Sequence, residues 1–182
     1  MTDLDRLRQV YQQAECLHSR EDIMQGIAQM GAEISNDLQN ENPIVMGVMN
    51  GGLVFVGHLL PELSMPLQVD YLHATRYGNE ETGRELTWHA KPRLDLQDRT
   101  VLLVDDIFDE GVTLDKVVHY CQDAGAKSVK VAVLLDKEHD RKKTTLVPDY
   151  TCKKVPDRFV FGFGLDAKSY WRNAPGIFAV ID

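Results

Sequence analysis

The sequence contains little cysteine. Cys16, Cys121 and Cys152 are the three in the chain, an odd number, and no CxxC spacing occurs. This excludes a disulfide framework, which needs paired cysteines, and gives no support to a structural zinc site. The six histidines also show no metal-binding spacing, so we interpret them all as ordinary surface or core residues. A reducing cytoplasm is the simplest predicted location.

Long apolar runs and an excess of positive charge are also lacking. No segment approaches the length of a membrane span, and the acidic first residues contain no apolar signal core. The 20 Lys and Arg residues are outnumbered by 28 Asp and Glu residues, which gives a formal net charge of -8. Nucleic acids and anionic membranes bind basic surfaces, so we expect neither as a partner.

Internal repeats, low-complexity tracts and linkers long enough to separate domains are absent from the sequence as well. A chain of 182 residues with 43% hydrophobic content can build one substantial core, but it is too short for two ordinary domains. We therefore expect a single domain, residues 1–182.

The most informative segment that is present covers residues 101–114. Aliphatic residues at 101–104 predict a strand covered on both faces, as in a parallel sheet. Asp105 and Asp106 follow at its carboxyl end, where they could bind ribose hydroxyls or a hydrated magnesium ion. Apolar residues then recur at helical spacing, at Leu114, Val117, Val118 and Cys121. The loop between, residues 109–113, would direct main-chain amides at one point near the positive end of that helix, where a phosphate is stabilised.

The side chains of this loop add to the prediction. Gly111 lets the backbone approach a ligand closely, and the Thr113 hydroxyl can donate a further hydrogen bond. The predicted phosphate-binding residues are Asp109, Glu110, Gly111, Val112 and Thr113. The alternative is that the segment is only a solvated strand-to-helix turn. A lone Asp-Asp pair would be compatible with that alternative, but the full pattern of residues 101–114 disfavours it.

This segment resembles the ribose-phosphate signature of type I phosphoribosyltransferases. In that signature, hydrophobic residues precede two acids, two apolar residues, an Asp, a small residue, a Gly, any residue and a Thr. Glu110 departs from it, because Thr or Ser is more usual there, and a carboxylate aimed into the loop would repel a phosphate. The resemblance implies an α/β fold with a central, mainly parallel sheet flanked by helices and a small hood formed from terminal segments.

The likeness to the hypoxanthine-guanine branch of this family extends over residues 43–182. Residues 44–49 predict a second buried strand, which is followed by the turn Asn50-Gly51-Gly52. Two glycines permit an amide cluster for pyrophosphate, although by themselves they are equally compatible with an ordinary turn. The family often has a Lys before the glycines and a cis peptide bond. Asn50 removes that positive charge, and we predict that the Met49-Asn50 bond is cis.

Residues 128–137 predict a third buried strand that ends in charged residues. Lys137 matches the lysine that donates to the six-position oxygen of the purine in the resembling enzymes. An ammonium there would favour 6-oxopurines, because adenine offers it no acceptor. A lysine at a strand end is otherwise most often a solvated surface residue.

A further motif covers residues 155–166. By resemblance, Phe159 stacks on the purine, the backbone of Val160 reads the base edge, and Asp166 lies near a magnesium ion on the pyrophosphate side. Arg172 matches an arginine that clamps pyrophosphate, a role that suits its planar, two-pronged guanidinium. The other two aromatic residues of the motif, Phe161 and Phe163, are predicted to lie in the core.

The remaining elements follow from periodicity. We expect an amphipathic helix over residues 4–14, a second capped by Ser19 and Asp22 and ended by Asn42-Pro43, an apolar helix over 53–60, and strands over 69–74 and 85–90. The polar segment 75–84 lies between those two strands. From the residues alone, an exposed hairpin loop is at least as good an interpretation of this segment as a closing lid. The resemblance favours the lid, since Arg76 and Tyr77 fall near the family's Ser-Tyr pair.

Together, the resemblance implies a magnesium-dependent enzyme of purine salvage. It would transfer the phosphoribosyl group of phosphoribosyl pyrophosphate to N9 of hypoxanthine or guanine, giving IMP or GMP and pyrophosphate, with Asp109 as the general base at N7. The resembling enzymes are commonly homodimers or homotetramers. The alternative is a metabolite-sensing regulator with the same fold and little catalysis, although the basic nucleic-acid surface usual in such proteins is not evident. A plain Rossmann domain would need a Gly-rich fingerprint that the sequence lacks.

Overall fold

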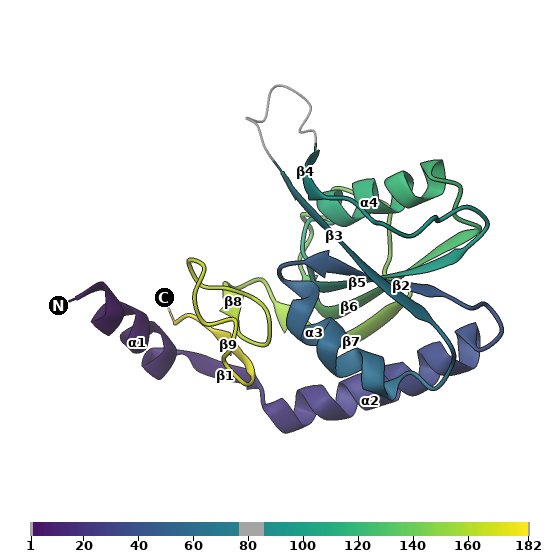
Figure 1. Ribbon diagram of the computed structural model, residues 1–182. Coiled ribbons are helices and arrows are strands. Elements are labelled where there is room, and N and C mark those ends of the chain that lie inside the picture. Colours follow the sequence, from purple (N-terminus) through teal and green to yellow (C-terminus); the bar gives the residue numbers. More distant parts are fainter. Residues whose placement is uncertain (1, 77–85, 182) are drawn as a thin grey trace.

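The structure, a computed structural model, describes residues 2–76 and 86–181 and contains a large and a small sheet (Figure 1). The order of strands in the large sheet is β4 (Leu86–Ala90), β3 (Gln68–Arg76), β2 (Ile44–Met49), β5 (Thr100–Phe108), β6 (Ser128–Glu138) and β7 (Tyr150–Pro156). Neighbouring strands run parallel except β3 and β4. The expected α/β fold with a mainly parallel central sheet is confirmed.

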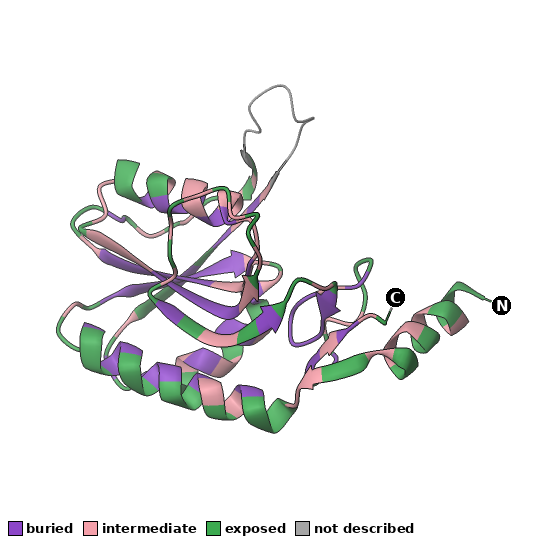
Figure 2. Cartoon of the chain, turned by 180° about the vertical axis from the view of Figure 1, so that it is seen from behind, coloured by how far each residue is buried: buried purple, intermediate pink, exposed green. Residues whose placement is uncertain are grey.

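Helices cover both faces of the large sheet. α2 (Arg20–Leu38) and α3 (Gly52–Leu59) lie on one face, α4 (Val112–Asp123) lies on the other, and a 3₁₀ turn, η1 (Leu60–Glu62), extends α3. Along β5, Leu102 and Val104 pack with the α2 and α3 side, while Val101 and Leu103 pack with the α4 side. The inner strands β2, β5 and β6 each contain five consecutive buried residues, and much of this part of the sheet is coloured as buried in Figure 2. This two-sided burial explains why the strands are continuous apolar runs.

The second helix begins as its sequence indicates. The Ser19 hydroxyl accepts the Asp22 amide hydrogen and the Asp22 carboxylate accepts the Ser19 amide hydrogen, which is a capping box. Its buried apolar face consists of Ile23, Ile27, Met30, Ile34 and Leu38. The helix ends at Leu38, earlier than the predicted stop at Asn42-Pro43, because no apolar residue beyond Leu38 extends that face.

The small sheet is the hood that the sequence led us to expect. Its strand order is β1 (Glu15–His18), β9 (Ile177–Ala179) and β8 (Val160–Phe161), so it combines segments from near both chain ends. The first helix, α1 (Asp3–Gln13), joins it by stacking Tyr11 on Trp171 with ring centroids 4.8 Å apart. The hood reaches the large sheet at Gly164, where an added Cβ would lie 2.4 Å from the carbonyl oxygen of Gly51. That close approach places the hood against the turn that follows β2.

β5 continues through the two acids to Phe108, whereas the apolar run alone predicted a strand over residues 101–104. Of the segment interpreted as a lid or a hairpin loop, residues 77–84 lie outside the described residues. Within the residues that are described, no helix combines the length and apolar character that a membrane crossing requires.

Candidate active site at the carboxyl edge of the large sheet

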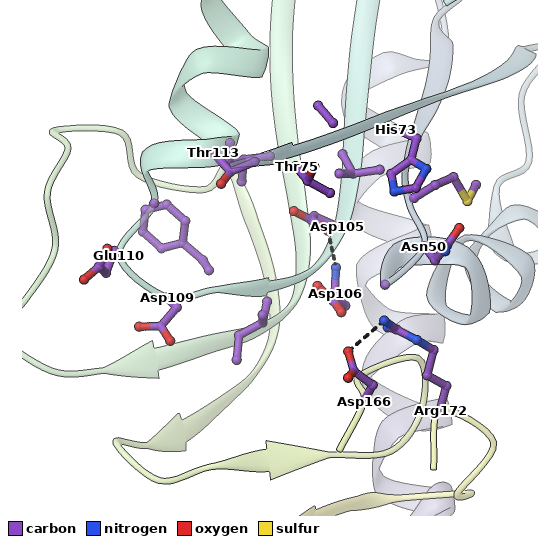
Figure 3. A pocket seen from close by; sticks show the side chains of 18 residues that line it. Asn50, His73, Thr75, Asp105, Asp106, Asp109, Glu110, Thr113, Asp166 and Arg172 are labelled. Atoms are coloured by element: carbon purple, nitrogen blue, oxygen red, sulfur yellow. Dashed lines mark hydrogen bonds and ion pairs between the residues drawn. The ribbon is translucent and has the colours of Figure 1, made fainter. Parts of the chain in front are cut away.

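A cavity of about 360 Å³ lies at the carboxyl ends of β2, β3 and β5 (Figure 3). Ten of the residues predicted for the site line it, namely Asn50, Gly51, Asp105, Asp106, Asp109, Glu110, Gly111, Thr113, Asp166 and Arg172. They come from three separate stretches of sequence, including one in the hood. This is the sheet edge at which open α/β proteins bind their ligands.

The predicted phosphate loop is shorter than expected. α4 begins at Val112, so Val112 and Thr113 form its first turn and only residues 109–111 form the loop. Gly111 has a φ of 82°, and an added Cβ there would lie 2.4 Å from Thr144 Cγ2. Since first-turn amides have no acceptor within their own helix, those of Val112 and Thr113 are suited to an external anion at the positive end of α4.

Glu110, the departure from the family signature, is neutralised within the protein. Its Oε1 lies 2.8 Å from Lys143 Nζ, and its carbonyl oxygen accepts the Lys143 amide hydrogen at 2.9 Å. In Figure 3 the Glu110 side chain extends away from Asp105 and Asp106. The pairing with Lys143 offsets the charge that would otherwise repel a phosphate in this loop.

Asp105 and Asp106 form a carboxylate pair on the wall of the cavity. Burial raises the pKa of Asp105 well above its ordinary value, and the charge of Asp106 raises it further. Burial also raises the pKa of Asp106, against the opposing effects of a hydrogen bond with Asp105 and the charge of Arg172. A pair of this kind is stabilised as anions only when a cation or hydroxyl donors face it.

The turn after β2 passes close to these acids. The Met49-Asn50 peptide bond is cis, as predicted. A Cβ at Gly51 would lie 2.0 Å from Asp106 Oδ2, and one at Gly52 would lie 2.9 Å from the carbonyl oxygen of Val104. Both glycines are therefore required for the turn to lie against β5. Figure 3 shows Asn50 at the side of the cavity opposite the phosphate loop.

The hood contributes an ion pair to the same side of the cavity. Arg172 Nη2 lies 2.7 Å from Asp166 Oδ1, and Arg172 Nη1 donates to the carbonyl oxygen of Gly164 at 2.6 Å. The second carboxylate oxygen of Asp166 accepts the Ser169 amide hydrogen at 2.7 Å. These contacts hold the guanidinium of Arg172 near Asp106, as Figure 3 shows.

Asp109, the predicted base, is held by two cationic or polar neighbours. Its Oδ2 lies 3.0 Å from Lys137 Nζ and its Oδ1 lies 2.7 Å from His139 Nε2. Desolvation raises the pKa of Asp109, but the hydrogen bonds and charges of Lys137 and His139 outweigh it, and the net pKa is lowered. The carboxylate is therefore ionised and available as a proton acceptor.

Comparison with known proteins agrees with this geometry. Residues 13–168 match the family model described as the phosphoribosyl transferase domain. The chain belongs to the phosphoribosyl transferase family. A relative from Bacillus subtilis strain 168 named hypoxanthine-guanine phosphoribosyltransferase is 33% identical over 162 residues, which cover 88% of this chain and 89% of that protein.

Solved structures of other phosphoribosyl transferases have the same fold. A hypoxanthine phosphoribosyltransferase from Staphylococcus aureus has a TM-score of 0.89 and 28% identity, covering 94% of both chains. A mutant of the hypoxanthine phosphoribosyltransferase from Trypanosoma cruzi, solved as a ternary substrates complex, has a TM-score of 0.87 and 26% identity. It covers 94% of this chain and 97% of that one.

The residues predicted to bind the purine, Lys137, Phe159 and Val160, are not among those that line the cavity. Lys137 reaches the site through its ion pair with Asp109. Val160 is buried in β8, while Phe159 is 57% exposed and so open to a ligand. Their roles stay predictions. Phe161 and Phe163 are buried, which confirms their assignment to the core.

Several residues of the site were not predicted from the sequence. His73 and Thr75 line the cavity from the end of β3, and His139 contacts Asp109. A signal existed for each. β3 was predicted and runs parallel to β2, so its end shares the same edge. His139 stands two positions after Lys137, a spacing that places both on one side of an extended chain.

The residues present fit a magnesium ion that substrate oxygens help to bind. In the described part of the chain, no three His, Cys, Asp or Glu side chains come close enough to hold a metal by themselves. Asp105, Asp106 and Asp166 nevertheless face one cavity, and magnesium is commonly bound by one or two carboxylates together with substrate phosphates and water.

Proposed function

We propose that the protein is a hypoxanthine-guanine phosphoribosyltransferase of purine salvage. It transfers the 5-phosphoribosyl group from phosphoribosyl pyrophosphate to N9 of hypoxanthine or guanine and releases pyrophosphate. The observation that carries this proposal is the single cavity that joins the amino-terminal end of α4, the Asp105 and Asp106 pair and the Arg172 guanidinium. The names of the relatives support the same activity.

In this proposal the sugar phosphate lies along the cavity. Its 5'-phosphate binds the loop 109–111 and the first-turn amides of α4, where the helix dipole favours negative charge. The ribose hydroxyls face Asp105 and Asp106. The pyrophosphate lies between the turn Asn50-Gly51-Gly52 and Arg172, whose planar fork can bind two phosphate oxygens at once.

The base enters beside Asp109. Its N9 lone pair attacks C1' as the bond from C1' to the pyrophosphate oxygen breaks, and the electron pair leaves with pyrophosphate. Arg172 stabilises the negative charge that grows on the leaving group. The proton on N7 passes to the Asp109 carboxylate, a contribution of about 10²-fold to 10⁴-fold for general-base catalysis. Lys137 donates to the six-position oxygen, and Phe159 and Val160 contact the ring.

Magnesium is the proposed cofactor. Asp166 and the pair Asp105 and Asp106 would hold it together with substrate oxygens, and when bound it would neutralise charge on the pyrophosphate. Since the protein carries a formal net charge of -8, attraction of an anionic substrate depends on local groups such as Arg172 and the α4 terminus.

We further propose self-association, as a dimer or tetramer, in a reducing cytoplasm. An apolar hollow of about 510 Å³ lies beside α3 and β3, and its lining includes Leu53, Val69 and Tyr71, which are 58%, 51% and 47% exposed. Contiguous exposed apolar surface of this kind is typical of protein interfaces. All three cysteines are free thiols, which a reducing compartment would preserve.

A base-by-base assay tests the proposed activity. Purified protein with magnesium and phosphoribosyl pyrophosphate would be given hypoxanthine, guanine, xanthine or adenine separately, and pyrophosphate release would be measured. We expect turnover with hypoxanthine and guanine and little with adenine. Omission of phosphoribosyl pyrophosphate is the control. Failure with every base would contradict the proposal, and turnover with adenine alone would contradict its substrate.

A further inference from the structure

His139 makes the shortest polar contact with Asp109. It follows directly after β6, its side chain is only 3% exposed, and its Nε2 lies 2.7 Å from Asp109 Oδ1. No substrate contact is proposed for this histidine.

The contact of the second ring nitrogen, Nδ1, shows which nitrogen of the His139 ring carries the hydrogen. Its Nδ1 lies 2.9 Å from the backbone nitrogen of Arg141, and that amide can only donate. Nδ1 must therefore present a lone pair, and the hydrogen of the neutral imidazole lies on Nε2. The contact with Asp109 is then a hydrogen bond in which Nε2 donates and the carboxylate oxygen accepts.

The loop that carries His139 is tied to the sheet. Lys142 Nζ donates to the carbonyl oxygen of Phe108 at 2.9 Å and to Asp136 Oδ1 at 2.7 Å. Arg141 pairs with Asp157. His139 thus contacts Asp109 from a fixed position. The ammonium of Lys137 is carried on a flexible four-carbon side chain, so it can move to another acceptor.

We propose that His139 is a positioning residue that holds Oδ1 of Asp109 by donating its Nε2 hydrogen, so that Oδ2 is presented to N7 of the purine. This inference rests on the proposed function. When Lys137 turns from Oδ2 to the oxygen of the base, His139 remains on Oδ1. The N7 proton then passes to Oδ2, and His139 keeps the hydrogen on its Nε2.

The charges around Asp109 agree with this arrangement. Desolvation raises the pKa of Asp109, and the hydrogen bonds and charges of Lys137 and His139 together overcome that effect. The hydrogen bond with Asp157 is the main cause of the raised pKa of Arg141, and the charges of Asp109 and Glu110 add to it, so Arg141 is a further cation that acts on Asp109. Loss of the His139 donor would therefore raise the pKa of Asp109. As the pH is lowered, the activity that needs ionised Asp109 would then be lost at a higher pH than in the unaltered protein.

Two substitutions separate hydrogen-bond donation from mere filling of space. H139Q keeps an amide donor near the position of Nε2, whereas H139L keeps a similar volume without a donor. Neither variant offers an acceptor at the Nδ1 position, so both lose the Arg141 contact equally. We expect kcat with hypoxanthine to fall about tenfold or more in H139L, the scale of a hydrogen bond to a charged group, and to stay within about threefold in H139Q.

Further readouts make the role specific. KM for phosphoribosyl pyrophosphate should be unchanged in H139L, and the acidic limb of kcat/KM should move to higher pH in H139L but not in H139Q. In the Asp109→Ala background, H139L should cause no further loss of kcat, because its effect passes through that carboxylate. Equal kcat values and pH profiles for H139L and the unaltered protein would overturn the inference, as would an equal loss in both variants.

Nitrogen NMR of ¹⁵N-histidine-labelled protein tests the hydrogen-bond geometry without any turnover. With the His139 signals assigned by their loss in H139Q, Nε2 should be protonated and Nδ1 unprotonated in the free protein. A proton on Nδ1 would overturn the inference even if the enzyme is active. Absence of turnover in the unaltered protein would overturn the proposed function and the role of His139 together. Normal turnover with no effect of H139L would overturn only the latter.

Discussion

Replacement of Asp109 by Ala tests the proposed chemistry most directly. The change removes the acceptor of both the Lys137 ammonium and the His139 ring, whose side chains are 12% and 3% exposed, while Asp109 itself is 37% exposed. Since water can enter from the exposed side and solvate the two donors, we expect the free energy of unfolding to fall by only about 1 kcal/mol. The variant should therefore fold.

The effect of Asp109→Ala on catalysis should be much larger than its effect on stability. A general base contributes about 10²-fold to 10⁴-fold, or about 3 to 5 kcal/mol of activation free energy. We expect kcat with hypoxanthine to fall by that factor. Binding of phosphoribosyl pyrophosphate should change little, because the α4 terminus and Arg172 are untouched.

Initial rates of pyrophosphate release would give kcat, and calorimetric titration would give the affinity for phosphoribosyl pyrophosphate. Thermal unfolding of the variant controls for loss of structure. A kcat within threefold of the unaltered enzyme would refute the assignment of Asp109 as the base. A large loss of affinity with an unchanged kcat would show instead that this carboxylate serves the sugar phosphate.

Three other predictions concern single features of the site and the core. Lys137→Gln should lower the preference for hypoxanthine over adenine by about tenfold or more in kcat/KM, and an unchanged ratio would remove the proposed contact with the base. Gly111→Ala should lower the free energy of unfolding in urea by at least about 1 to 2 kcal/mol, because φ is 82° there and the new Cβ meets Thr144. The same change should weaken the binding of phosphoribosyl pyrophosphate. An unchanged free energy of unfolding would contradict the observed turn. Burial raises the pKa of the Cys121 thiol to about 12, so a thiol reagent at pH 8 should modify the exposed Cys16 in the native protein and reach Cys121 only after denaturation, as peptide mass mapping would show.

Elements that depend on local patterns were predictable from the sequence. The strand over Ile44–Met49 was predicted with its observed bounds, because a continuous apolar run between polar turns has few other interpretations. The Ser19 and Asp22 cap was predicted for a similar reason, since both partners lie within one turn of helix. The cis bond before Asn50 came from the resemblance and not from any local pattern.

Features that depend on contacts distant in sequence were not predictable in the same way. β5 continues through its acids because β6 pairs with it there, Asp105 with Val133 and Ile107 with Leu135, and no property of the acids announces this. The partner of Glu110 was also hidden, because Lys143 belongs to the loop after β6. The Asp109 and His139 contact joins the ends of two adjacent parallel strands, so it appears only once the sheet is assembled.

The cations named around the cavity are already paired in the free protein, which bears on how an acidic protein binds an anionic substrate. Arg172 pairs with Asp166, and Lys137 pairs with Asp109. Binding must therefore exchange partners: pyrophosphate replaces Asp166 at the guanidinium, and the purine oxygen replaces Asp109 at the ammonium. Each released carboxylate then needs a new positive or donor partner, because a partly buried charge left unpaired is costly. For Asp109 that partner is the N7 hydrogen of the base, with His139 still in place, and for Asp166 it is a cation brought with the pyrophosphate. A base without an N7 hydrogen offers Asp109 no new donor, and a base without a six-position oxygen offers Lys137 no new acceptor. Such a base cannot replace the ion pair between Asp109 and Lys137, and it should therefore bind poorly.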